Sequence, residues 1–139
     1  MTPEALSQTH LAAFGEDKAW STEIFAKLLS DTSVIVAGSK DGFVLGRVTL
    51  DEAEILTVAT ATDKQRQGLA KAALAAFLDR AERAGATSVV LEVAEDNTAA
   101  KHLYEHAGFS VVGERKNYYR TKTAPAVTAL ILRRDLPTS

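Results

Sequence analysis

Apolar side chains recur every three or four residues between positions 68 and 84, the period of an α-helix. Charged side chains fall on the opposite side of the same segment. The apolar positions are Leu69, Ala73, Leu74, Phe77, Leu78 and Ala81, and the charged ones are Lys71, Asp79, Arg80, Glu82 and Arg83. Gly85 follows, and glycine is common just past the end of a helix. The pattern predicts a helix over 68–84 that buries one face.

Three more helices are predicted from their capping residues. Thr2 precedes Pro3, a residue that suits the first position of a helix. Ser21 starts the second helix, with Trp20 and Phe25 spaced to pack together across the cap. That helix is expected to bury Ile24, Phe25, Leu28 and Leu29. Asn97 is expected to cap the last helix, which Gly108 ends.

Six segments rich in apolar and β-branched residues are predicted to be strands, at 33–39, 43–50, 54–62, 88–94, 109–113 and 127–132. Asp41-Gly42 is a tight-turn signal between the first two, so the first three form an antiparallel meander. A helix joins the third strand to the fourth, which favours a parallel or V-shaped arrangement there. We expect one α/β domain over 1–139, with a mixed, mostly antiparallel sheet of about six to seven strands and about four helices.

Composition excludes several classes of function. The 139 residues are 46% apolar and 24% charged, with a net charge of −2, so a general nucleic-acid-binding surface is not expected. The chain has no cysteine, which removes disulfides, thiolate metal ligands and a cysteine nucleophile. It has neither a membrane-length apolar run nor a signal-peptide pattern at its N-terminus. We therefore expect a cytoplasmic protein with no membrane partner.

The segment between the third strand and the strong helix is a candidate anion site. It reads Gln65-Arg66-Gln67-Gly68-Leu69-Ala70, and Lys64 and Lys71 flank it. Unpaired amides and the helix dipole attract anions at such a position. It is neither a phosphate-binding P-loop nor a dinucleotide fingerprint. The plainer interpretation, a tight loop with solvated charges, has about equal support from spacing alone.

Here the sequence resembles the GNAT superfamily of N-acetyltransferases, whose acetyl-CoA pyrophosphate loop reads Gln/Arg-x-x-Gly-x-Gly/Ala. Other segments extend the resemblance toward protein N-terminal acetyltransferases: Leu91-Glu92-Val93, Asn97, Ala99-Ala100, Leu103-Tyr104, Gly108-Phe109, Arg115 and Asn117-Tyr118-Tyr119. The greatest likeness is to the bacterial type that acetylates the N-terminal alanine of a small-subunit ribosomal protein. The resemblance implies a sheet splayed between the third and fourth strands to admit acetyl-CoA.

The resemblance also implies roles for individual residues. It implies that the pyrophosphate is held by Arg66, Gln67, Gly68, Leu69, Ala70 and Lys71, and that the pantetheine and thioester meet the backbone of Val58, Ala59 and Thr60. Asn97 is a helix cap that would also contact the cofactor. Tyr118 and Tyr119 match an aromatic pair that lines the acceptor cleft, and at least one of them would do so here, since alternation along a strand sends their side chains to opposite faces. Glu92 would be the general base and Tyr104 the general acid of a direct transfer with no metal.

Each role has a plainer alternative from the residues alone. Glu92 fits a solvated glutamate on the exposed side of its strand, and Tyr104 fits a core tyrosine that shares a helix face with Ala100 and Leu103.

An α-amine, with a pKa of about 7.7–8.0 against ~10.4 for lysine, is the easier acceptor to deprotonate. A lysine, a small-molecule amine or a non-catalytic acyl-CoA-binding module stays an alternative, and no oligomeric state is assigned.

His102-x-x-Glu105-His106 matches a short zinc-binding pattern of metallopeptidases. A zinc peptidase is therefore an alternative to the transferase. The two histidines lie one helical turn apart. We expect them on a solvated face opposite Leu103 and Ala107, with no metal bound.

Overall fold

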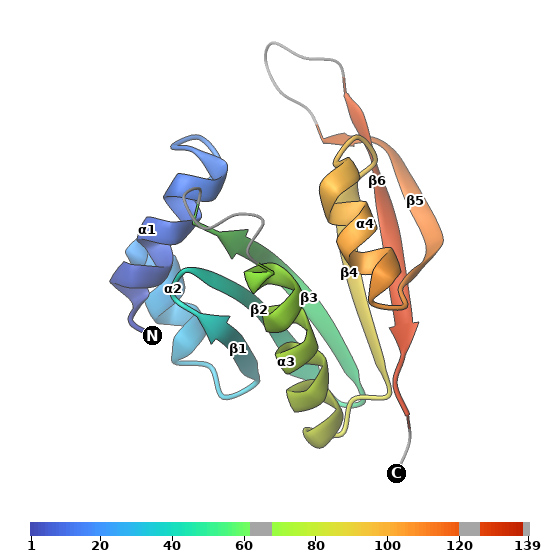
Figure 1. Ribbon diagram of the computed structural model, residues 1–139, viewed down its shortest axis with the longest axis horizontal. Coiled ribbons are helices and arrows are strands. Elements are labelled where there is room, and N and C mark those ends of the chain that lie inside the picture. Colours follow the sequence, from blue (N-terminus) through green and yellow to red (C-terminus); the bar gives the residue numbers. More distant parts are fainter. Residues whose placement is uncertain (62–67, 120–125, 138–139) are drawn as a thin grey trace.

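The computed structural model describes residues 1–61, 68–119 and 126–137, and the side chains of all of these except 117–119. The helices are α1 (Pro3–Phe14), α2 (Thr22–Leu29), α3 (Leu69–Arg83) and α4 (Thr98–His106) (Figure 1). The strands are β1 (Val34–Ser39), β2 (Gly42–Thr49), β3 (Glu52–Thr60), β4 (Ser88–Ala94), β5 (Ser110–Tyr119) and β6 (Val127–Asp135).

The predicted helix caps are confirmed. The Thr2 hydroxyl accepts a hydrogen bond from the Ala5 amide, the Ser21 hydroxyl accepts one from the Ile24 amide, and the Asn97 side chain accepts one from the Ala100 amide. These bonds satisfy amides that a helix start leaves unpaired. The strand bounds were predicted less well, because β5 continues past residue 113 to Tyr119 in pairing with β6, and β6 continues past residue 132 to Asp135 in pairing with β4.

The sheet is mixed, and in the described residues it has six strands in the order β1-β2-β3-β4-β6-β5. The first three form the predicted antiparallel meander, and β6 is antiparallel to both of its neighbours, β4 and β5. β3 and β4 are parallel, and their pairing covers only 52–54 against 88–90. Past Glu54 and Val90 the two strands diverge (Figure 1), so the sheet has the predicted V-shaped opening.

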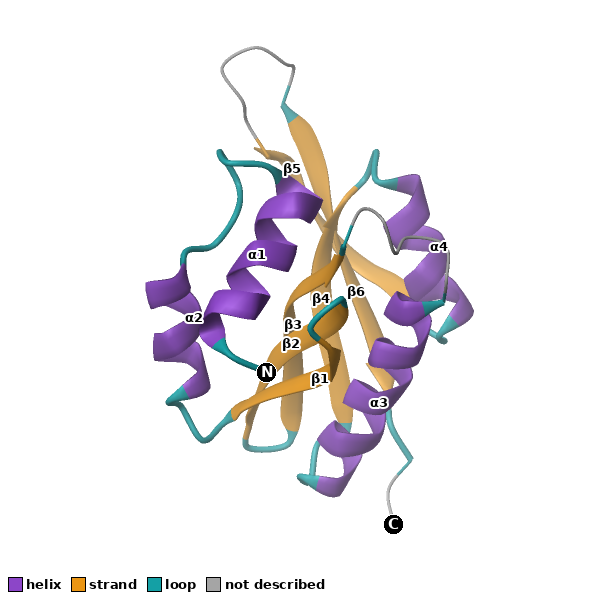
Figure 2. Ribbon diagram, turned by 60° about the vertical axis from the view of Figure 1, so that its left-hand side comes forward, coloured by secondary structure: helices purple, strands orange, loops and turns teal. Residues whose placement is uncertain are grey.

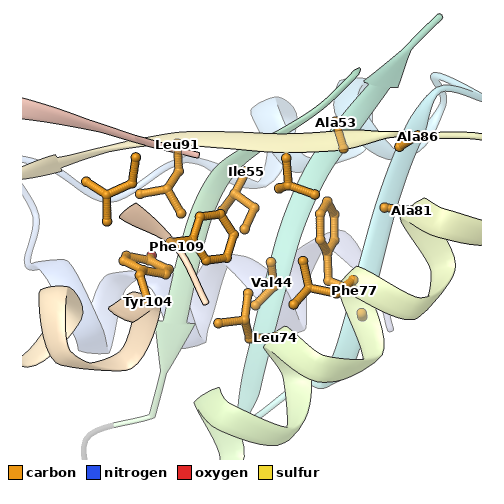
Figure 3. Packing of buried hydrophobic residues seen from close by; sticks show 14 of the residues in the cluster. Val44, Ala53, Ile55, Leu74, Phe77, Ala81, Ala86, Leu91, Tyr104 and Phe109 are labelled. Atoms are coloured by element: carbon orange, nitrogen blue, oxygen red, sulfur yellow. The ribbon is translucent and has the colours of Figure 1, made fainter. Parts of the chain in front are cut away.

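Helices cover both faces of the sheet (Figure 2). α3 and α4 lie on one face over a core that includes Val44, Ile55, Phe77, Leu91 and Phe109 (Figure 3). α1 and α2 lie on the other face over a smaller core of Leu6, Phe25, Phe43, Leu45 and Ala59. The prediction that Ile24 is buried was wrong, because its side chain is 45% exposed on the outer side of α2.

β3 contains a bulge that resets which residues face which core. Leu45 pairs with Thr57 and Gly46 pairs with Ile55, so Leu56 is an extra residue with no opposite partner. Ile55 packs on the α3 side, whereas Leu56 and Thr57 both turn toward α1. The bulge lies just before Val58 to Thr60.

Candidate active site

The open side of β3 presents backbone groups that none of the described strands pairs with. The Ala61 amide donates to the Asp41 carbonyl at 2.7 Å, so alternation along the ladder turns the Ala59 amide toward β2. The amides of Val58 and Thr60 then point the other way, toward β4, whose pairing with β3 has ended at Glu54. In the described part of the chain these two amides are placed to donate to a bound group, whereas Ala59 is turned to β2.

The N-terminus of α3 lies beside this opening. Gly68 takes a left-handed conformation with φ of 77°, and no side chain of the described residues caps the helix there. A Cβ on Gly68 would meet no described atom within 4 Å, and Lys71 is exposed in the first turn. Amide donors, the helix dipole and a lysine together suit a phosphate group. Arg66 and Gln67, predicted to belong to the same loop, lie outside the described residues.

A groove of about 570 Å³ runs between α3 and α4, from Lys71 and Ala99 to Arg134 and Leu136. The exposed His102 and His106 line it together with Leu103 and Ala107. The expectation that the histidines lie opposite Leu103 and Ala107 was therefore wrong, because neighbouring residues on a helix are only about 100° apart. Among the residues that the structure describes, no group of three His, Cys, Asp or Glu is placed to hold a metal.

Glu92 lies on β4 with its side chain on the face away from α3 and α4. Its neighbours Leu91 and Val93 are buried on the other face, as the alternation predicted. The Glu92 side chain is 32% exposed, and its Oε1 lies 3.4 Å from Nε of Arg115 on β5. Sequence reasoning gave Arg115 no role of its own, because the contact depends on a strand order that brings β5 within reach of β4.

Tyr104 lies on the opposite face of the sheet from Glu92. It lies on α4, is 7% exposed and packs its ring edge-on to Phe109 with centroids 5.8 Å apart (Figure 3). As predicted, Ala100, Leu103 and Ala107 flank it on the core side of the helix. The structure thus holds Tyr104 on one side of the sheet and Glu92 on the other. The side chains of Tyr118 and Tyr119 lie outside the described residues, and only their backbone is placed, in β5.

A buried histidine of α1 contacts the bulged strand β3 on the α1 side of the sheet. Nε2 of His10 lies 3.0 Å from Oγ1 of Thr57, and Nδ1 of His10 accepts a hydrogen bond from the Trp20 amide. The ring is also in contact with the rings of Phe14 and Phe25. Burial lowers the pKa of His10 from 6.5 to about 4. His10 is therefore neutral near pH 7, with its proton on Nε2.

No helix within the described residues is long and apolar enough to span a membrane.

Comparisons with known proteins agree with this geometry. The model of the acetyltransferase (GNAT) family matches residues 4–109. The [ribosomal protein bS18]-alanine N-acetyltransferase of Escherichia coli is 37% identical over 106 residues, 73% of this chain and 72% of that protein. The N-alpha-acetyltransferase RimI of Mycobacterium tuberculosis is 34% identical over 131 residues, which are 88% of this chain and 79% of that protein. A crystal structure of the Escherichia coli ribosomal-protein-S18-alanine N-acetyltransferase superposes with a TM-score of 0.85 at 30% identity, covering 99% of this chain and 89% of that one.

Proposed function

The chain belongs to the acetyltransferase (GNAT) family, and from that premise we propose that it transfers an acetyl group from acetyl-CoA to the N-terminal α-amine of a protein. One observation carries the proposal: the V-shaped opening between β3 and β4 has Glu92 on one side of the sheet and Tyr104 on the other. The names of the relatives support the N-terminal alanine of a small-subunit ribosomal protein as the acceptor.

Acetyl-CoA supplies an acetyl group activated as a thioester, and the residues present fit it. The uncapped start of α3, with Gly68, Leu69, Ala70 and Lys71, would hold the pyrophosphate. The amides of Val58 and Thr60 would hold the pantetheine and the thioester carbonyl, since both point into the opening. Asn97, whose side chain already caps α4, would contact the cofactor from the other wall.

Glu92 and Tyr104 would manage the protons of a direct attack by the amine. Glu92 accepts the proton that the acceptor ammonium must lose, on the face from which a peptide would approach. The Tyr104 hydroxyl donates a proton to the departing sulfur from the cofactor side. An α-amine of pKa about 7.7–8.0 loses its proton far more easily than a lysine of pKa ~10.4. A half-exposed carboxylate is therefore an adequate base for this acceptor.

At least one of Tyr118 and Tyr119 is proposed to line the acceptor cleft, because β5 carries both on the same sheet as Glu92. A single sheet with both cores packed on it supports one catalytic domain over 1–139. A ribosomal acceptor is consistent with action in the cytoplasm.

Two measurements test the proposal. Acetyl-CoA at ~100 times its Kd should stabilise the fold by about 2.7 kcal/mol, a Tm increase of roughly 5–10 °C. Release of free thiol is then followed with short peptides beginning with Ala, Ser or Met, with the same peptides blocked at the N-terminus but containing a lysine, and with small amines. Turnover with the free Ala peptide should exceed the others. Absence of a Tm change would overturn the cofactor assignment, and equal turnover with blocked peptides would overturn the α-amine acceptor.

A further inference from the structure

Among the described residues, Arg115 is a charged group that lies against the proposed base. The Arg115 guanidinium Nε and the Glu92 carboxylate Oε1 are 3.4 Å apart, and the side chains are 53% and 32% exposed. An ion pair this exposed contributes little to stability. An effect on the Glu92 carboxylate is the one that this contact points to.

The sheet places the two residues so that only a long side chain can join them. β6 lies between β5 and β4. Arg115 is level with Ala129 of β6, whereas Glu92 is level with Ile131, so the contact runs diagonally over two strand spacings of about 4.8 Å each. Opposite Ile131 on β5 stands Gly113, which has no side chain to obstruct that path. The long stem of an arginine suits this distance.

We propose that Arg115 is a positioning residue that fixes the Glu92 carboxylate in the orientation needed to take a proton from the acceptor amine. A glutamate side chain has several freely rotating bonds, and an unheld one spends much of its time in unproductive orientations. A planar guanidinium holds a carboxylate in a defined direction. A lysine ammonium does this less well. The inference rests on the proposed function, because it gives Arg115 a role only through Glu92.

The test compares steady-state kcat and KM for Arg115→Met, Arg115→Lys, Glu92→Gln and the double variant Glu92→Gln/Arg115→Met, with acetyl-CoA and a peptide beginning with Ala. Methionine keeps an apolar stem over the sheet and removes the charge. Arg115→Met should lower kcat roughly 10- to 100-fold with little change in the KM for acetyl-CoA. Arg115→Lys should recover part of that loss. In the Glu92→Gln background, Arg115→Met should add almost nothing, since a residue that acts through Glu92 has nothing left to position.

Lys116→Met is the matched control. Lys116 is the next residue on β5, and its Nζ lies 4.0 Å from Oε1 of Glu114, not of Glu92. This variant removes the same charge from the same strand and should keep wild-type kcat.

The outcomes separate the two proposals. If Glu92→Gln keeps full turnover, the assignment of the base in the proposed function fails, and the role of Arg115 fails with it. If Glu92→Gln is impaired and Arg115→Met is not, only the positioning role fails. An equal loss from Arg115→Met with and without Glu92, or a loss confined to the KM of the peptide, would also overturn the positioning role.

Discussion

Nε2 of His10 and Oγ1 of Thr57 lie 3.0 Å apart, which ties α1 to β3 one residue before the backbone proposed to receive the thioester. The Trp20 amide donates to the other ring nitrogen, so both polar atoms of a histidine that is only 2% exposed are satisfied in its neutral form. Protonation of Nδ1 would break the bond to Trp20 and place a charge among aromatic rings.

We therefore expect the free energy of unfolding to fall as the pH is lowered from about 6.5 toward 4. The pKa of His10 is about 4 in the fold and about 6.5 in the unfolded chain, so the unfolded state binds more protons in that window. This group can contribute a slope of up to about 1.4 kcal/mol per pH unit. Urea unfolding at pH 4.5, 5.5, 6.5 and 7.5 measures it. His10→Gln should be less stable at pH 7.5 but should lose this part of the slope, whereas the exposed His106→Gln should keep it. An unchanged slope in His10→Gln would contradict the prediction.

Tyr104→Phe should separate chemistry from packing. Phenylalanine retains the ring that packs edge-on to Phe109, so the aromatic packing should be kept, whereas loss of the hydroxyl removes the proposed acid. We expect kcat to fall about 100-fold while the Tm increase with acetyl-CoA is retained. Thiol release and thermal unfolding on the same preparation provide both readouts. Full turnover in this variant would leave Tyr104 as a core residue only.

Gly68→Ala should weaken cofactor binding more than it weakens the fold. A Cβ at Gly68 costs about 1–2 kcal/mol in the left-handed conformation and extends into open space where a phosphate would approach. Gly85, at the other end of α3, is the matched control: its φ is 96° and a Cβ there also meets no described atom within 4 Å. Both variants should lose similar stability. Calorimetric titration with CoA should show a Kd at least 10-fold higher for Gly68→Ala alone, and equal Kd values would place the phosphates elsewhere.

Leu50→Gly should stabilise the protein. Leu50 lies at the tip of the β2–β3 turn, is 91% exposed and has a φ of 57°. A left-handed backbone costs a non-glycine residue about 1–2 kcal/mol, which outweighs the extra freedom that glycine gains when unfolded. We expect a Tm increase of roughly 1–3 °C. Leu50→Ala, which keeps the strain and removes the exposed side chain, should show no such gain in the same thermal scan.

Sequence reasoning succeeded where the cause was local. Thr2, Ser21 and Asn97 cap their helices by bonds to residues three positions away, so their effect is readable from the chain. It failed at Ile24 because an apolar residue at helical spacing need not face the core. The bulge at Leu56 was not predicted either, since it depends on the register with β2 and leaves no mark in Ile55-Leu56-Thr57.

Features of the candidate site that depend on local sequence were likewise predicted, and those that depend on strand pairing were not. Glu92 and Tyr104 fell on the predicted faces of their elements because alternation and helical period decide those faces. The division of Val58, Ala59 and Thr60 into outward and inward amides required the ladder with β2. The Arg115–Glu92 pair required the order of three strands, which no spacing in the chain encodes.

The short seam between β3 and β4 also governs how the molecule can flex. Three residue pairs at one end join the meander to the β4-β6-β5 half, and no ladder bonds cross the diverging remainder in the described strands. A small rotation about the seam therefore widens or narrows the far end while both halves keep their internal ladders intact. We therefore expect a long, thin molecule to enter and leave this opening without unfolding of either half of the sheet. Amides of 52–54 and 88–90 lie at that pivot, so they should be among the slowest in the sheet to exchange with solvent deuterium.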